Sequence, residues 1–152
     1  MKPEYILIHH SLTKDGKVVD WNAIFKYHTE ELGWNDIGYH YGIERIGNKY
    51  AVLTGRPENV VGAHTKQNRM NYKSLGICVV GNYDNERPPE IVMDLLVDKC
   101  VELCLKYDIP SSHIKAHHDY ASYKTCPGKM FPMSELIERV QNRLYKLGVK
   151  AC

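Results

Sequence analysis

The chain has 152 residues, of which 43% are hydrophobic and 25% are charged, and its formal net charge is +2. This length and composition predict one globular domain over residues 1–152, large enough to bury a core without disulfides or a structural metal. The small net charge, with Lys and Arg not gathered into runs, argues against a nucleic-acid partner.

The N-terminus has no apolar stretch of signal-peptide length, and no later segment is long and apolar enough to cross a membrane. We therefore expect cytoplasmic synthesis without a signal peptide, and no membrane partner. The five cysteines, at positions 78, 100, 104, 126 and 152, have no framework spacing, which is typical of a reducing compartment. Cys100 and Cys104 lie one helical turn apart on an apolar stripe, which favours core residues over a metal clip. A monomer is expected, and pairing of Cys152 with a second chain stays open.

In the first half of the chain, residues 5–9 read as a short buried strand. A helix is predicted from Asp20, a plausible N-cap, to about residue 32, with Gly33 as the stop. His28 lies on the apolar stripe of this helix, so we interpret it as a hydrogen-bonded core histidine rather than a ligand. The stripe comprises Trp21, Ile24, Phe25, His28 and Leu32. Residues 39–43 and 49–53 read as two strands joined through a turn near Gly47-Asn48.

In the second half, residues 62–72 read as a loop and residues 74–80 as an apolar strand. A helix is predicted from Pro88-Pro89, with the stripe Val92, Leu96, Cys100, Leu103 and Tyr107. Residues 114–117 form a last short strand. Pro132 opens a final helix that ends before Gly148 and carries Leu136, Ile137, Val140, Leu144 and Leu147. Alternating strands and helices predict an α/β domain, with a central mixed sheet flanked by about three helices.

The stretch HHDYASYKTCPG at 117–128 places two histidines, a lysine and a cysteine within ten residues. Imidazole and thiolate are good zinc ligands, and His9-His10, at the end of an apolar run, offers a third. Adjacent strand residues point to opposite faces, so one histidine of each pair would face the site. Three ligands leave the fourth position of zinc open for water and hydrolysis. The spacing matches no short zinc signature, and the alternative is polar strand ends with a buried thiol.

Four stretches carry a resemblance to a known family, and they occur in that family's order. They are ILIHHS at 6–11, GWNDIGYHYGI at 33–43, GAHTKQNRMNYKSLGICVVGNYD at 62–84 and AHHDYASYKTCPG at 116–128. Together they cover most of the chain. The sequence resembles zinc-dependent N-acetylmuramoyl-L-alanine amidases, a family that includes short phage lysozymes with amidase activity and the peptidoglycan recognition proteins.

The resemblance implies one zinc ion per chain, on one face of the sheet, held by His9, His117 and Cys126. It implies Tyr39 and Lys124 as catalytic residues. In the loop at 62–72 and just after it, it implies substrate contacts by His64, Asn71 and Lys73. The chain departs from the family at Ser122-Tyr123, where relatives often carry Pro or Gly, and its segment from His117 to Cys126 is one residue longer than in some of them. His118, where relatives often have Arg, is interpreted as structural.

The implied reaction is hydrolysis of the amide between N-acetylmuramic acid and L-alanine in peptidoglycan. We expect a phage-type endolysin that acts on the cell wall after the membrane is breached, with peptidoglycan or a muropeptide as its partner. One alternative is a cytoplasmic amidase that recycles muropeptide fragments. Another is a peptidoglycan-binding module without catalysis, but in such relatives the third ligand is commonly lost to Ser. Because Cys126, both ligand histidines, Tyr39 and Lys124 are all present, the sequence favours catalysis.

Overall fold

The computed structural model describes residues 1–12 and 20–149. Within them, one five-stranded sheet has the order β3-β2-β4-β1-β5. Its strands are β1 (Tyr5–His10), β2 (Tyr41–Ile46), β3 (Lys49–Thr54), β4 (Ser74–Val79) and β5 (Ile114–Ala116). β4 pairs in parallel with β1 and β2, β5 is parallel to β1, and β3 is antiparallel at the edge. This confirms the predicted α/β domain with a central mixed sheet.

The parallel pairing brings two histidine pairs to the same edge of the sheet. β1 ends with His9 and His10, and the adjacent β5 leads directly into His117 and His118. Because neighbouring parallel strands end at the same edge, residues more than 100 positions apart meet there. This edge positions the candidate site described below.

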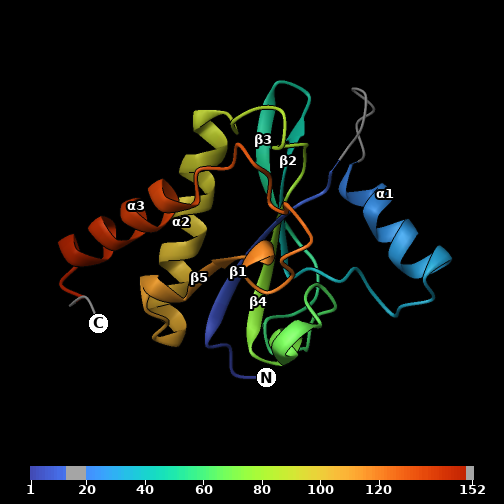
Figure 1. The fold of residues 1–152 in the computed structure, drawn as a ribbon, viewed down its shortest axis with the longest axis horizontal. Helices are drawn as coiled ribbons and strands as arrows, with labels where there is room; N and C mark the ends of the chain where they lie inside the picture. The colour runs from blue at the N-terminus through green and yellow to red at the C-terminus, as the bar shows by residue number, and fades with distance from the viewer. Residues whose placement is uncertain (13–19, 150–152) are drawn as a thin grey trace.

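The helices lie on opposite sides of the sheet. α2 (Glu90–Tyr107) and α3 (Met133–Lys146) cover one face, while α1 (Trp21–Lys26) lies on the other side (Figure 1). Side chains alternate along β1, so that Ile6 and Ile8 join the main core with α2 and α3, whereas His9 turns toward the opposite face. The candidate site therefore lies on the face of the sheet opposite to α2 and α3.

The core under α2 and α3 follows the predicted apolar stripes closely. The buried members are Val92, Leu96, Cys100, Leu103, Leu136, Val140 and Leu144. Cys100 and Cys104 are buried free thiols, which confirms them as core residues. The prediction was wrong for Leu147, which is 59% exposed, because α3 ends at Lys146 and the helical period ends with it. Cys152 lies outside the described residues.

The predicted extent of the first helix is confirmed. Asp20 caps it, accepting a hydrogen bond from the backbone N–H of Ala23 at 2.7 Å. α1 continues directly into a π-helical segment, η1 (Tyr27–Glu31), and Gly33, with φ of +71°, ends it in the left-handed conformation that glycine adopts readily.

The predicted apolar stripe of that helix is wrong in two places. Phe25 and Leu32 are 40% and 42% exposed. Ile24 packs on a small cluster with Ile37 and Cys78 rather than on the main core, so only a narrow face of the helix is buried. The wider π-helical turn then changes the side-chain register before Leu32.

Several element boundaries near the site differ from the sequence-based expectation. β2 begins at Tyr41, so Tyr39 precedes the strand. β5 ends at Ala116, and His117 begins a 3-10 turn, η4 (His117–Asp119), which follows another, η3 (Ser111–His113). The loop at 62–72 contains a 3-10 segment, η2 (Gln67–Tyr72). Among the described residues, no helix combines the length and hydropathy needed to cross a bilayer.

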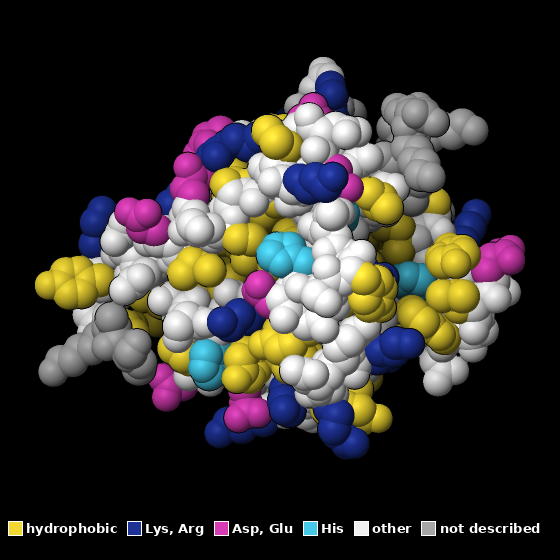
Figure 2. Space-filling view, viewed as in Figure 1, with side chains coloured by type: hydrophobic (Ala, Val, Ile, Leu, Met, Phe, Trp, Pro, Cys, Tyr) yellow, Lys and Arg dark blue, Asp and Glu magenta, His cyan; other side chains and the backbone are white. Residues whose placement is uncertain are grey.

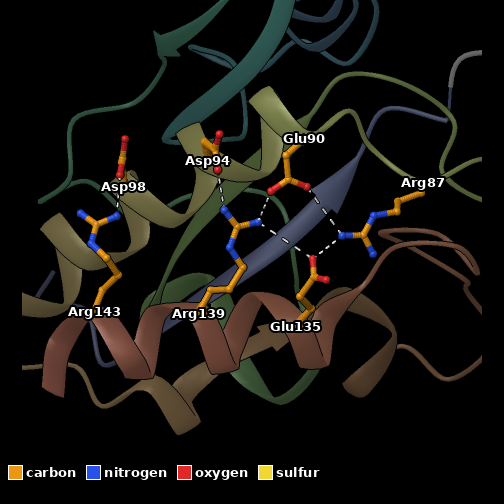
Figure 3. A network of polar contacts seen from close by, with 7 residues as sticks. All are labelled: Arg87, Glu90, Asp94, Asp98, Glu135, Arg139 and Arg143. Atoms are coloured by element: carbon orange, nitrogen blue, oxygen red, sulfur yellow. Dashed lines mark hydrogen bonds and ion pairs between the residues drawn. The ribbon is translucent and has the colours of Figure 1, made fainter. Parts of the chain in front are cut away.

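A network of ion pairs connects α3 with α2 at the surface (Figure 3). Arg139 on α3 lies between two α2 carboxylates, with N–O distances of 2.9 Å to Glu90 and 2.5 Å to Asp94. Farther along, Arg143 pairs with Asp98 at 2.8 Å. Near the start of α3, Arg87 pairs with Glu135. Arg139 therefore forms ion pairs with several carboxylates of the network at once.

We expect Arg139→Ala to lower the free energy of unfolding by about 1 kcal/mol, because it leaves neighbouring carboxylates facing each other without their shared cation. The effect should shrink in high salt, since exposed charges are screened. Urea unfolding at low and high salt measures it. Arg143→Ala, which removes one pair, is the control and should cost less. Equal costs for both variants, or no salt dependence, would contradict the network.

Candidate metal centre

Three potential metal ligands come together at the carboxyl edge of the sheet. The ligand atoms of His9, His117 and Cys126 all lie within 4.8 Å of one another. His9 Nδ1 is 3.7 Å from Cys126 Sγ, and the His9 and His117 rings are 4.5 Å apart. Both histidines are buried and Cys126 is half-buried. These are the three residues that the family resemblance implied as zinc ligands.

The second histidine of each pair points elsewhere, for two different reasons. His10 faces the other side of the sheet, where its Nδ1 accepts a hydrogen bond from the Tyr83 N–H at 3.2 Å. Strand alternation accounts for this, as expected. His118 is exposed, with Nδ1 3.5 Å from an Asp119 oxygen, but it follows His117 in a 3-10 turn. For that pair the turn, rather than strand alternation, separates the side chains.

Backbone and side-chain hydrogen bonds hold the loop that carries Cys126. The His118 N–H donates to the Cys126 carbonyl at 2.9 Å, and the His10 N–H donates to Cys126 Sγ at 3.4 Å. Asp84, after β4, accepts from the Thr125 hydroxyl at 3.0 Å and from the Lys129 N–H at 2.9 Å. Hydrogen bonds at Cys126 and at residues before and after it in the chain therefore fix the position of the thiol.

Burial sets the protonation states of the three ligands. It holds the pKa of His9 well below its ordinary value and, with the Lys124 charge, lowers the pKa of His117 to about 4. Burial raises the pKa of the Cys126 thiol to about 11, against the opposing effect of the His10 N–H. Near neutral pH, both imidazoles are thus neutral and the thiol keeps its proton. Two neutral imidazoles and a cysteine fit a zinc ion, which displaces the thiol proton on binding.

We expect zinc binding at pH 6 to release about one proton per ion, because only the Cys126 thiol has a proton to lose. Two histidines with ordinary pKa values would be mostly protonated at that pH and would raise the release to about 2.5 protons. Calorimetric titration in buffers of different ionisation enthalpy measures this number. A release above two would contradict the neutral state of His9 and His117.

Tyr39 lies beside His9. Its ring is 5.2 Å from the His9 ring. Burial, together with the nearby Cys78 and Cys126, raises the pKa of Tyr39 well above its ordinary value, so the phenol stays protonated and can donate a hydrogen bond. His28 supports the preceding turn, since its Nδ1 accepts from the Gly38 N–H at 2.9 Å. This confirms His28 as a hydrogen-bonded core histidine.

Lys124 is exposed on the loop between His117 and Cys126. Its charge lowers the pKa of His9, His117 and Cys126, so its field is felt at all three ligands. Lys124 also lines a cleft of about 300 Å³ that opens beside His117. An exposed ammonium at this place can face a group bound in the cleft.

The cleft contains some of the predicted substrate residues and not others. His64 and Asn71 line it, and Lys73 does not. The Asn71 side-chain oxygen accepts from the backbone N–H groups of His64 and Thr65, each at 2.7 Å, so Asn71 anchors that segment. On the face seen in Figure 2, a histidine near the centre lies against hydrophobic side chains, and charged side chains of both signs lie farther out.

Six further residues line the cleft that the sequence did not single out as site residues: Trp34, Ala63, Thr65, Lys66, Gln67 and Tyr123. Gln67 Nε2 donates a hydrogen bond to Tyr123 Oη at 3.0 Å and so joins the loop at 62–72 to the loop of Cys126. Tyr123 belongs to the departure at Ser122-Tyr123. The other five lie in the stretches at 33–43 and 62–84 that carry the family resemblance, but no residue type among them pointed to a specific role.

A comparison with known proteins identifies the family of the chain. Residues 1–129 match the family model described as N-acetylmuramoyl-L-alanine amidase. The chain belongs to this family. The match ends before α3, which begins at Met133.

Individual relatives of this amidase domain include phage and animal proteins. The endolysin of Enterobacteria phage T3 is 39% identical over 131 residues, covering 82% of the chain and 80% of the relative. Peptidoglycan-recognition protein LB of Drosophila melanogaster is 32% identical over 130 residues, covering 82% of the chain and 54% of that protein. The solved structure of the N-acetylmuramoyl-L-alanine amidase LysC from Clostridium intestinale URNW has a TM-score of 0.75 and 32% identity, covering 98% of this chain and 87% of that one.

Proposed function

We propose that this chain is a zinc-dependent amidase of the phage-endolysin type, which hydrolyses the bond between N-acetylmuramic acid and L-alanine in peptidoglycan. The observation that carries the proposal is the cluster of His9, His117 and Cys126, with Tyr39 beside His9 and with Lys124 lining a cleft next to His117. Membership of the amidase family and the likeness to phage endolysins support it. We propose that residues 1–152 act as one catalytic domain.

His9, His117 and Cys126 would hold one zinc ion, and three protein ligands are the number found in catalytic zinc sites. When bound, zinc supplies a Lewis acid and lowers the pKa of coordinated water to about 7. The protein holds both imidazoles neutral, ready to bind the ion without first losing protons. The Cys126 thiolate then serves as a ligand and is not free to act as a nucleophile.

Tyr39 and Lys124 would act on the substrate carbonyl. As water adds to the carbonyl carbon, negative charge develops on the oxygen. The protonated Tyr39 phenol donates a hydrogen bond at the attacking water or at this oxygen, and the Lys124 ammonium offsets its charge. Such groups stabilise the transition state more than the neutral substrate, so they raise kcat.

The leaving group of this reaction is the amino group of L-alanine. The carbon–nitrogen bond breaks, water supplies the new carboxylate oxygen, and the amine must gain a proton as it leaves. Lys124 would pass that proton to the nitrogen, a role supported by its exposure and by its place in the cleft lining. The products are a lactyl carboxylate on the sugar and a free peptide amine.

The test is a reaction with purified peptidoglycan sacculi, with and without a chelator, in which freed L-alanine amino groups are measured. We expect release that the chelator abolishes and zinc restores, with the glycan strands left intact. Binding of zinc and sacculi without release would instead identify a binding module. Release from a soluble anhydro-muropeptide but not from sacculi would identify a recycling amidase.

A further inference from the structure

His64 is held in a fixed orientation against the sheet. Its ring packs on two glycines: a Cβ added to Gly76 would lie 2.6 Å from His64 Cγ, and one added to Gly62 would lie 2.7 Å from Cδ2. Its backbone N–H is bound by the Asn71 side chain at 2.7 Å. Gly76 lies on β4 beside Leu7 of β1, so the ring rests on the strand next to the one that carries His9.

The surroundings of the His64 ring determine which nitrogen carries its proton. Nε2 lies 3.4 Å from the Ser74 carbonyl oxygen. A carbonyl can only accept, so Nε2 carries the hydrogen of the neutral ring. Nδ1 of His64 is then a lone-pair acceptor.

This acceptor faces the first of the three metal ligands. His64 Nδ1 is 3.0 Å from His9 Nε2, so Nε2 of His9 must carry the proton of this hydrogen bond. The Thr65 hydroxyl lies 3.4 Å from His9 Nε2 and 3.3 Å from His64 Nδ1, where it can accept from the first and donate to the second. With its proton on Nε2, His9 has its lone pair on Nδ1, the atom that lies 3.7 Å from Cys126 Sγ.

We infer that His64 is a positioning residue: fixed by the Ser74 carbonyl, it accepts the Nε2 proton of His9 and so directs the His9 Nδ1 lone pair to the metal. The inference rests on the proposed zinc site. It also assigns His64 a role other than the substrate contact expected from the sequence, because both of its ring nitrogens are engaged within the protein.

The outer hydrogen bond of a metal-bound histidine fixes its tautomer and ring orientation, and losing such a partner typically weakens metal binding by 10- to 100-fold. We therefore expect His64→Leu to raise the zinc dissociation constant by roughly 10- to 100-fold. His64→Gln keeps an oxygen that can accept from His9, and it should retain most of the affinity. Competition with a chromophoric chelator measures both variants.

The control is His113→Leu, which removes a histidine from η3, outside the cleft, where it stacks on Tyr5. It should bind zinc like the wild type. Equal affinity of His64→Leu and the wild type would overturn the inference, as would an equal loss in His64→Gln and His64→Leu. Gly76→Ala is a second variant, in which His64 is intact but its ring must move. It should also weaken zinc binding, and unchanged affinity would count against the inference.

The tautomers of His64 and His9 provide a second test, because a purely structural role of His64 would not require a particular tautomer of either ring. Long-range ¹H–¹⁵N NMR spectra of the wild-type protein should show His64 and His9 both protonated at Nε2, in the metal-free and the zinc-loaded states. Protonation of either ring at Nδ1 would overturn the inference. Since the metal-free spectrum needs neither zinc nor substrate, this result stays distinct from a failure of the proposed amidase activity.

Discussion

Replacing Cys126 with serine is expected to reduce amide hydrolysis to the level of the chelated protein. Cys126 supplies the sulfur of the three-ligand cluster, and a serine hydroxyl is a much poorer zinc ligand than a thiolate. Zinc affinity should fall by more than about 100-fold, because loss of a coordinating atom exceeds the loss of an orienting partner. Zinc content after dialysis and release of L-alanine amino groups measure the two effects.

Cys104→Ser is the matched control, since it changes a buried thiol of α2 in the main core. It should lower stability but leave the zinc content at one ion per chain. Full activity of Cys126→Ser with stoichiometric zinc would refute the assigned ligand set. Sacculus binding by this variant is expected to persist, because the cleft walls do not include Cys126.

The second large effect is expected at Lys124. Lys124→Met keeps much of the side-chain length but removes the charge that is felt at all three ligands. We expect kcat to fall by about 100- to 1000-fold with little change in KM, as for loss of one donor that stabilises transition-state charge. Steady-state kinetics on a soluble muropeptide separates the two parameters.

Lys129→Met is the control for this change, because Lys129 is also exposed and lies on the other side of Cys126 in the same loop. It should leave kcat within about twofold, since only a remote surface charge is lost. Lys124→Arg should recover part of the activity by restoring the charge. A KM effect without a kcat effect would instead place Lys124 in substrate binding.

Local patterns in the sequence were enough for most of the fold. The Asp20 cap, the Gly33 stop and the stripe of α2 depend on neighbouring residues, and all three are confirmed. The opposite orientation of His9 and His10 was also predictable, because a strand alternates its side chains with a period of two. These features needed no knowledge of the tertiary structure.

Features that depend on distant segments were not predictable in the same way. His117 belongs to a 3-10 turn, which the short strand before it did not reveal. The contact of His64 with His9 requires the loop at 62–72 to fold over β4 and β1, and no local period encodes that arrangement. Phe25 is exposed because only a narrow face of α1 packs against a hydrophobic cluster. The His64 contact and the exposure of Phe25 both depend on how distant segments pack.

The distance along the chain between the first and last ligands has a consequence for the stability of the whole domain. His9 and Cys126 are separated by 117 positions, so an ion held between them would close most of the polypeptide into one loop. A cross-link that closes a loop of about 100 residues removes about 4–5 kcal/mol of chain entropy from the unfolded ensemble. A catalytic ion at this place would therefore also stabilise the folded domain, and its removal would lower the free energy of unfolding.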